Sequence, residues 1–332
     1  MTQRATLAPG FLVGLLTGLC AAAGSVPAVA TEAAYPPGVI RIVVPYGAGN
    51  PPDVVSRLVA TELSEIIGRR TIVENRPGGL ATIAMRDVLR QPADGRTVIL
   101  FDSPMAASSA LASNLGLRVE TDFSPVIKIS RAYNVLVVHP SVPARTVAEL
   151  VSVLKSQPDR FTFSTGPFGT PAHLIAEMFK LQAGVRATQV PYPGVQARLM
   201  DLVGGITQGD FLATSLALDF IATGKLRPLA VTSPQRVAAL ADVPTVVEEG
   251  FPDLVVEGWF GFAVKNGTPN ELIARLNEAI NTILANPKIR QALANLGAEP
   301  AGGTPAEFGL FIKSEVARWA RVVKESGIKL QE

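Results

Sequence analysis

The sequence has 332 residues, of which 48% are hydrophobic and 17% are charged, with 30 Lys and Arg against 28 Asp and Glu. A chain of this length and composition can bury two cores of ordinary domain size. The near balance of charge provides no strongly basic surface, so we expect no nucleic-acid partner. Cys20 is the single cysteine, and the two histidines, His139 and His173, are far apart in sequence. We therefore predict no disulfide, no metal site and no cofactor.

The first thirty residues are typical of a secretory signal. Arg4 precedes an apolar run over residues 7–23, and Ala28-Val29-Ala30 is a small-x-small cleavage site. The run is shorter than the ~20 residues that a membrane-spanning helix needs. Leu19 precedes Cys20 and is not small, which argues against lipidation at that cysteine. We expect cleavage after Ala30 and export of the mature chain to the periplasm.

Runs with strand character alternate with runs of helical period along the mature chain. In the first series, strands are predicted over residues 40–45, 71–74, 97–101 and 135–138, and helices over 54–67 and 83–89. In the second series, helices are predicted over 147–154, 172–182 and 196–203, and strands over 161–164 and 188–191. This alternation predicts an α/β fold of parallel sheets in two lobes, with helices on both faces. The tail, 269–332, is predicted as helices that pack on the first lobe.

Three strand-to-helix loops share a related pattern, and the first spans residues 45–53. Gly47 and Gly49 allow a sharp turn and a close approach to a ligand. Asn50 suits the helix N-cap, Pro51 the first turn, and Asp53 the third position, where its carboxylate reaches back to the cap. The loop predicts a cradle of backbone amides for an anion, and the alternative is a well-capped helix after a turn. Its spacing matches neither a phosphate-binding loop nor a dinucleotide fingerprint.

The second loop, residues 164–173, repeats this plan. Thr170 suits the N-cap, Pro171 the first turn, and His173 the third helical position. The helix dipole disfavours a protonated imidazole there, which predicts a neutral His173. No nucleophile or orienting acid stands in a local motif, so a structural or ligand-orienting histidine is favoured over a catalytic one.

The third loop, residues 190–196, offers neutral hydrogen bonds from Tyr192 and Gln196. Tyr192 also provides a wall for a pocket, and the alternative is a turn with a half-buried tyrosine. If the three loops lie at the carboxyl ends of parallel strands in two facing lobes, they converge on one cleft.

Motifs along essentially the whole mature chain together resemble the extracytoplasmic solute receptors of tripartite tricarboxylate transporters, the Bug-type binding proteins. The motifs are residues 40–53, Glu74-Asn75-Arg76-Pro77-Gly78, Asp94-Gly95, 134–140, Gly169-Thr170 with His173, 190–192, 224–226, 230–233, 242–245, 259–261 and 297–305.

The resemblance implies a two-lobed, periplasmic-binding-protein-like (type II) fold, in which each lobe is a mostly parallel sheet flanked by helices. Two strands would cross at the hinge, near residues 130–134 and 255–259. Lobe one would comprise residues 35–132 and 257–332, and lobe two residues 133–256. The lobes would close on a ligand, and the closed form would be recognised by the membrane subunits of a transporter. We expect a monomeric receptor rather than an enzyme.

Ligands of this family are typically small carboxylates held by backbone amides, hydroxyls and bridging waters. Carried over by position, lobe one would bind through Tyr46, Gly47, Ala48, Asn50, Asp53 and Ser103. Lobe two would bind through Thr165, Gly166, Gly169, Thr170, His173, Tyr192 and Gly194.

The chain departs from the family pattern at several places. The first loop has Gly49-Asn50 where the family usually has two glycines. Gln208 and Leu212 stand where the family often has aspartates that meet an amino or hydroxyl group of the ligand. An amino acid ligand is therefore disfavoured relative to a plain carboxylate, an aromatic carboxylate or a neutral amide.

Two other functions stay open from the sequence. One is an exported hydrolase that uses the same cleft, with Ser103 or Ser164 as nucleophile and His173 as base, although neither serine lies in a Gly-x-Ser-x-Gly elbow. The other is a ligand sensor for a membrane signalling partner.

Overall fold

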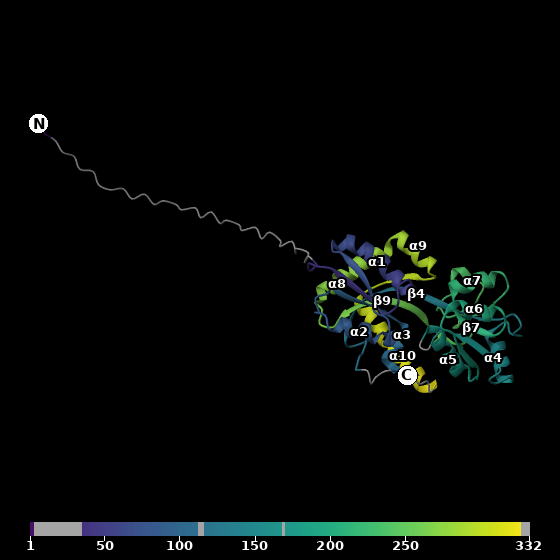
Figure 1. Cartoon of the computed structure of the whole chain (residues 1–332). Coiled ribbons are helices and arrows are strands. Elements are labelled where there is room, and N and C mark those ends of the chain that lie inside the picture. Colours follow the sequence, from purple (N-terminus) through teal and green to yellow (C-terminus); the bar gives the residue numbers. More distant parts are fainter. Residues whose placement is uncertain (3–34, 112–115, 168–169, 327–332) are drawn as a thin grey trace. The chain divides into compact units, whose positions relative to one another are not determined.

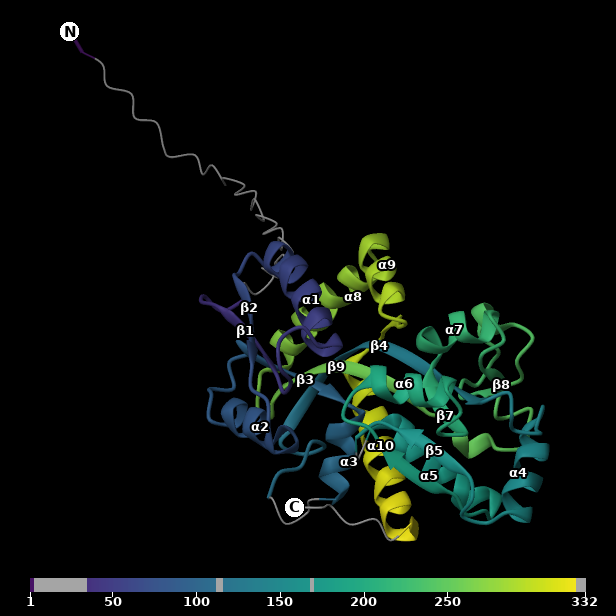
Figure 2. The same ribbon diagram turned by 45° about the vertical axis from the view of Figure 1, so that its right-hand side comes forward.

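A mixed sheet runs through the middle of residues 35–332, with helices on both of its faces (Figures 1 and 2). The computed structural model describes residues 1–2, 35–111, 116–167 and 170–326. Within these ranges ten strands form the sheet, in the order β2-β1-β3-β9-β4-β7-β5-β6, and β8 and β10 both pair with β4. Apart from its first two residues, the predicted signal segment, with Cys20 and the cleavage site, lies outside the described residues.

The first part of the sheet has parallel strands at its edge. β1 (Ile40–Val44) pairs in parallel with β2 (Thr71–Asn75) and β3 (Thr97–Asp102), and β9 (Glu257–Lys265) runs antiparallel to β3. Alternate side chains of β3 enter two different hydrophobic clusters, Val98 and Leu100 on one face and Ile99 and Phe101 on the other. Both faces are therefore buried, as a strand made almost entirely of apolar residues predicts.

The helices of this part cover both faces of the sheet. They are α1 (Pro51–Ile67), α2 (Thr82–Leu89), α3 (Ser103–Leu111), α8 (Asn270–Ala285), α9 (Pro287–Asn295) and α10 (Pro305–Ser326), with the short strand β10 (Glu299–Gly302) before the last helix. α1 packs against α8, while α10 packs against α3, β4 and α5. The predicted helical tail thus also contacts a helix from the second series. Within the described ranges, no helix is long and apolar enough to cross a membrane.

The second part of the sheet is built from the middle of the chain. β5 (Thr162–Thr165) pairs in parallel with β6 (Thr188–Pro191) and β7 (Gly209–Ala213), and β8 (Arg227–Val231) runs beside β4. The helices are α4 (Val147–Ser156), α5 (Pro171–Ala183), α6 (Val195–Val203) and α7 (Thr214–Ala222). Phe163, Phe179 and Phe211 pack with ring centroids 5.9–6.1 Å apart and form the aromatic centre of this part.

β4 (Phe123–Val138) joins the two parts because it is sixteen residues long. Its residues 123–133 pair with β9, and its residues 134–138 pair with β7 and β8. The fully buried Thr232 connects β4 to the second segment that passes between the two parts, the residues just before β9. Its Oγ1 accepts from the amide of Asn134 at 3.0 Å and donates to the carbonyl of Val256 at 2.8 Å. Both crossing segments are therefore fixed to one side chain.

The predicted helices and strands are present, with shifts of a few residues at their ends. The sequence reading did not identify α3, α7, β7, β8 and β10, and it recognised β4 and β9 only in part. β1, β2 and β3 pair in parallel, as do β5, β6 and β7, while the crossing strands β4 and β9 run antiparallel to each other and to their other neighbours. The boundaries of the two lobes stay a prediction.

We predict that Thr232→Val lowers the free energy of unfolding by about 1–3 kcal/mol, because it leaves the Asn134 amide and the Val256 carbonyl without that partner. Urea denaturation followed by circular dichroism measures this change. Thr61→Val is the control, since Thr61 is exposed and its hydroxyl bonds only within α1. Equal stability of the two variants would show that the hydroxyl of Thr232 does not hold the crossing together.

Candidate functional site

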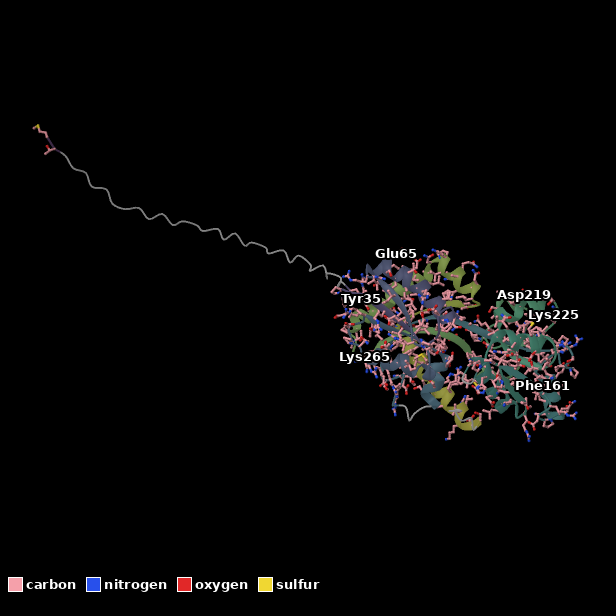
Figure 3. All side chains as sticks on the ribbon, in the orientation of Figure 1. Tyr35, Glu65, Phe161, Asp219, Lys225 and Lys265 are labelled. Atoms are coloured by element: carbon pink, nitrogen blue, oxygen red, sulfur yellow. The ribbon has the colours of Figure 1, made fainter. Side chains whose placement is uncertain are left out.

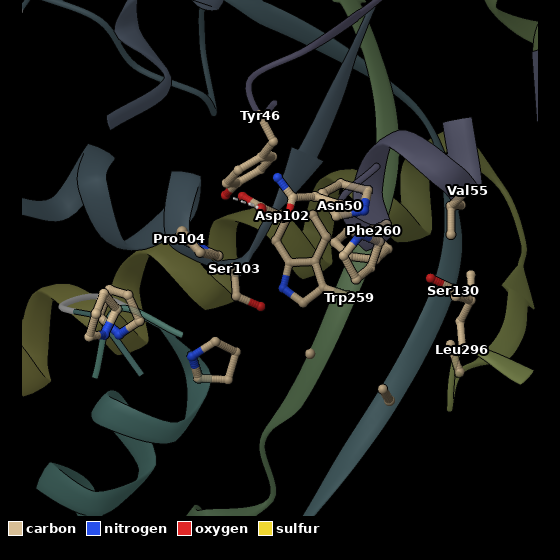
Figure 4. A pocket seen from close by; sticks show the side chains of 18 residues that line it. Tyr46, Asn50, Val55, Asp102, Ser103, Pro104, Ser130, Trp259, Phe260 and Leu296 are labelled. Atoms are coloured by element: carbon tan, nitrogen blue, oxygen red, sulfur yellow. Dashed lines mark hydrogen bonds between the residues drawn. The ribbon is translucent and has the colours of Figure 1, made fainter. Parts of the chain in front are cut away.

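A cavity of about 490 Å³ opens beside the end of β3, the middle of β4 and the start of β9, where they meet the segments that begin α1, α3 and α5 (Figure 4). Its floor is formed by Ser130 and Ala132 of β4 and by Gly258 and Trp259 of β9. Tyr46, Asn50, Asp102 and Ser103 supply polar groups from one side, and Pro167, Pro171 and Pro193 approach from the other. The three loops singled out in the sequence thus meet at one cavity.

Two smaller cavities adjoin this one and share Pro167 with it. The first, about 340 Å³, is lined by Gly47, Tyr46 and Thr170 among others. The second, about 320 Å³, is lined by Gly166, Thr170, Tyr192 and Gly194 among others. The three spaces together form a cleft between the loops of the first and second series.

Asp102 is the carboxyl group of the central cavity, and the sequence analysis did not identify it. Its side chain is 3% exposed, and it accepts hydrogen bonds from the Tyr46 hydroxyl at 2.5 Å and from the Met105 amide at 3.1 Å. Burial raises the pKa of Asp102 to about 6, although these two hydrogen bonds act in the opposite direction. Burial and the neighbouring carboxylate also raise the pKa of Tyr46. The tyrosine therefore stays protonated and donates to Asp102.

Ser103 follows Asp102 directly and begins α3. Its side chain is 1% exposed, and among the described residues its Oγ has no hydrogen-bond partner. Figure 4 shows this Oγ directed into the cavity. A buried hydroxyl without a partner costs free energy unless a ligand or water satisfies it, so Ser103 is a strong candidate for ligand contact.

Asp53, on the first turn of α1, stabilises the first loop through hydrogen bonds. Its carboxylate accepts from the Gly49 amide at 2.8 Å, from Arg57 at 3.0 Å and from Asn75 at 2.9 Å. Burial by itself would raise the pKa of Asp53, but these hydrogen bonds outweigh it and hold the pKa below its ordinary value. Asp53 is 2% exposed and lies outside the lining of the three cavities, so it shapes the loop rather than facing the space.

The first loop has fewer free backbone N–H donors than its glycine-rich sequence suggests. Pro51 and Pro52 occupy the first two positions of α1 and have no amide hydrogen. The amide of Val54 donates to the carbonyl of Asn50, as in an ordinary first helical turn. Asn50 lines the cavity, while Ala48 is exposed beside it. The predicted anion cradle at this helix is therefore poor in backbone donors.

The second loop contributes through both backbone and side chains. Thr170 stands at the N-cap of α5 and donates its hydroxyl to the Pro167 carbonyl at 2.7 Å. The hydroxyl of Thr165 is buried, with no hydrogen-bond partner in the described part of the chain. Gly169 lies outside the described residues. Thr165 lies at the end of β5 but is not among the residues that line the three cavities.

His173 lies behind the second loop and does not line any of the three cavities. Burial lowers its pKa, and Lys180 acts in the same direction against Glu177. The lowered pKa supports the predicted neutral imidazole, but the main cause is burial rather than the helix dipole. Of the two candidate nucleophiles, Ser164 donates to Asp210 at 2.6 Å, and the Ser103 hydroxyl has no hydrogen-bond partner among the described residues. His173 is not among the residues around the cavity of Ser103.

In the third loop, Tyr192 donates to Asp201 at 2.6 Å and presents its ring to the second smaller cavity. Gly194 is the N-cap of α6 and lines the same cavity. Arg198 of α6 also lines it, where both its Nε and Nη2 donate to the buried Asp210. The sequence analysis gave Arg198 no role, because its partner is a tertiary neighbour twelve positions away.

Trp259 lies near the start of β9, in the motif 259–261. It is 3% exposed, but it also lines the central cavity, and its Nε1 donates to Glu315 of α10 at 3.4 Å. The sequence signal for a role in the cleft was its position beside the second predicted crossing, where a large ring can face the space between the two parts of the sheet. Trp259 is therefore both a packing residue and a wall of the cleft.

A family model described as "Tripartite tricarboxylate transporter family receptor" matches residues 55–328. Over 316 residues the chain is 32% identical to Protein BugT of Bordetella pertussis, covering 95% of this chain and 97% of that protein. Solved structures with similar folds include R. palustris Rpa4515 with adipate, at 34% identity and a TM-score of 0.73 over 89% of this chain and 99% of that one. MatC of Rhodopseudomonas palustris with bound malate has 28% identity and a TM-score of 0.71, over 87% of this chain and 100% of that one.

The periplasmic binding protein BugD gives a third structural match, with 29% identity and a TM-score of 0.71 over 90% of this chain and 100% of that one. These structures confirm the predicted fold class, a two-lobed periplasmic-binding-protein-like (type II) α/β fold.

We predict that Asp53→Asn lowers the free energy of unfolding at pH 7 by about 1.5–3 kcal/mol, since it removes the charge that three donors stabilise. The folded-state pKa lies below the ordinary value, so this stability is present above about pH 4 and is lost as the pH falls through the folded-state pKa. Urea unfolding between pH 3 and pH 7 measures the difference, with exposed Asp219→Asn on α7 as control (Figure 3). A difference that does not shrink toward pH 3 would contradict the charge-based explanation.

Proposed function

The chain belongs to the tripartite tricarboxylate transporter receptor family, and we propose that it encloses a small carboxylate in the cleft and delivers it to membrane transporter subunits. It is a solute-binding receptor of the periplasmic type. The observation behind the proposal is the cavity of about 490 Å³ at the meeting point of the three loops. Its size lies in the range of small-molecule sites.

The walls of the cavity fit a ligand with a short apolar body. Val55, Phe260 and Leu296 line one side, and prolines line the other. The Ser103 hydroxyl lines the cavity, has no hydrogen-bond partner among the described residues and is available to a polar group of the ligand. Adipate and malate, found in two similar structures, are carboxylates of the matching size class. A carboxylate gains about 1.5–3 kcal/mol from each hydrogen bond to its charge, so three or four such bonds support micromolar binding after the cost of association.

We propose a binding set that keeps the residues predicted from the sequence and adds Asp102 and Trp259. The predicted residues that line the cleft are Tyr46, Gly47, Asn50, Ser103, Gly166, Thr170, Tyr192 and Gly194, while Asp53, Thr165 and His173 lie outside its lining. We propose that lobe one is residues 35–132 and 257–332 and that lobe two is residues 133–256. Closure would then occur about Thr232 and the two segments that it joins. The receptor would act as a monomer after removal of its signal segment.

We predict that Ser103→Ala weakens carboxylate binding about tenfold, which corresponds to the loss of ~1.4 kcal/mol for one hydrogen bond. Ser103 Oγ has no hydrogen-bond partner in the part of the chain that the structure describes, so we expect the unfolding free energy of this variant to stay near that of the wild type. Isothermal titration with dicarboxylates of four to eight carbons measures the affinity, and Ser152→Ala on the exposed face of α4 is the control. Unchanged affinity in Ser103→Ala would remove this residue from the binding set.

Transport itself is tested by ligand uptake in a strain that lacks the gene for this chain. A bound carboxylate recovered without chemical change, together with loss of uptake in the deletion strain, supports the proposed receptor. Unimpaired uptake with intact binding would favour the sensing role instead, and chemical conversion of the carboxylate would favour an enzyme.

A further inference from the structure

The charge of the central cavity is opposite to what a carboxylate receptor is expected to carry. Asp102 is the carboxyl group in its lining, and no Lys, Arg or His is found among the described residues that line it. Asp102 has two hydrogen-bond donors, a tyrosine hydroxyl and a backbone amide, and both are uncharged. A carboxylate ligand that reaches this end of the cavity therefore meets a second carboxylate without a neighbouring cation.

The charged groups on the surrounding elements do not change this balance. Tyr46, on the loop before α1, is the titratable group in contact with Asp102. Lys128 of β4 is paired with Glu257 of β9, and Arg318 of α10 is paired with Glu315 at 3.1 Å. Both cations are thus engaged by acidic partners near the floor of the cleft.

Asp102 and Ser103 offer one hydrogen-bond acceptor and one hydrogen-bond donor side by side. The carboxylate oxygens of Asp102 each accept one hydrogen bond and have a further lone pair, so Asp102 is an acceptor. The neighbouring Ser103 hydroxyl is unsatisfied and can donate. An acceptor beside a donor matches a carbonyl group that carries its own hydrogen-bond donor, as in a carboxamide or a protonated carboxyl group.

We propose that the ligand places a neutral, hydrogen-bond-donating carbonyl group at Asp102 and Ser103: either a carboxamide, or a carboxyl group that shares one proton with Asp102. This inference rests on the proposed function and specifies which ligands that cleft accepts. The proposed function then requires the anionic carboxylate to lie at the opposite end of the ligand.

The two forms of the ligand differ in proton balance. A carboxamide donates its own N–H, so the complex forms without a change in bound protons. A second carboxylate is bound only with one proton taken from water, because two close carboxylates cannot both stay ionised. In the free protein the pKa of Asp102 is about 6, so at pH 7.5 the site is almost entirely deprotonated.

The affinity for a dicarboxylate then depends on pH with a defined sign. Above about pH 6 each complex takes up one proton, so the dissociation constant rises about tenfold per pH unit. Below about pH 6 Asp102 is already protonated in the free protein, and the dependence levels off. The monoamide lacks this dependence above pH 6.

The experiment compares dicarboxylates of four to eight carbons with their monoamides on the mature protein. Isothermal titration of the tightest-binding pair at pH 7.5, in buffers of different ionisation enthalpy, counts the protons taken up. We expect about one proton for the dicarboxylate and about zero for the monoamide. Titrations from pH 5.5 to pH 8 give the slope of the dissociation constant.

Asp102→Asn tests the residue directly, because asparagine has the shape of a neutral Asp102. The variant should bind the dicarboxylate without proton uptake and, at pH 7.5, roughly 30-fold more tightly than the wild type, as a site with a pKa of about 6 requires. Monoamide binding should weaken several-fold, since a charged acceptor is replaced by a neutral one. Asp219→Asn removes an exposed charge on α7 and should leave the affinity for both ligands unchanged. A melting temperature near that of the wild type confirms that each variant is folded.

The failures of the two proposals are distinguishable. Dicarboxylate binding without proton uptake, or a loss of dicarboxylate affinity in Asp102→Asn, overturns the role of Asp102 and leaves the receptor function intact. Absence of binding by every dicarboxylate and every monoamide overturns the proposed function, and this inference falls with it.

Discussion

The antiparallel pairing of β4 with β9 is the constraint on which the rest of the structure depends. β4 continues past this pairing into the second part of the sheet, where it meets β7 and β8. Thr232 then fixes both crossing segments through one hydroxyl. Because the two strands lie side by side, the small residues Ala132 and Gly258 form the floor shared by two cavities. The floor of the cleft therefore lies two residues along the chain from Asn134 and Val256, the two positions that Thr232 joins.

The cleft has few backbone amide donors, and most of its hydrogen-bonding groups are side chains. Prolines stand at the first positions of α1 and α5, and further prolines line the walls, so these segments give few amide hydrogens to a ligand. Recognition then falls on side-chain hydroxyls, with Ser103 unsatisfied in the free protein and Tyr46 committed to Asp102. The proposed ligand, apolar along its length and different in charge at its two ends, fits this balance.

Local sequence signals were reliable where the physics is local. Pro51 at the start of α1 and Gly68 in the left-handed conformation at its end delimit a helix whose apolar spacing is visible in the sequence. Burial of β3 on both faces follows from its run of apolar residues. β10 was missed because its four residues, Glu299–Gly302, have no strand pattern and become a strand only through pairing with β4.

By itself, the sequence determined the family, the α/β class and the loops that form the cleft, because caps, periodicity and short motifs act over a few residues. Only the tertiary structure decided that Asp53 lies beneath its loop and that Asp102, 56 positions after Tyr46, belongs to the cavity. It also decided that Trp259 is a wall of the cleft. Burial, and the pKa that follows from it, depends on every segment packed around a group, and no local pattern contains that information.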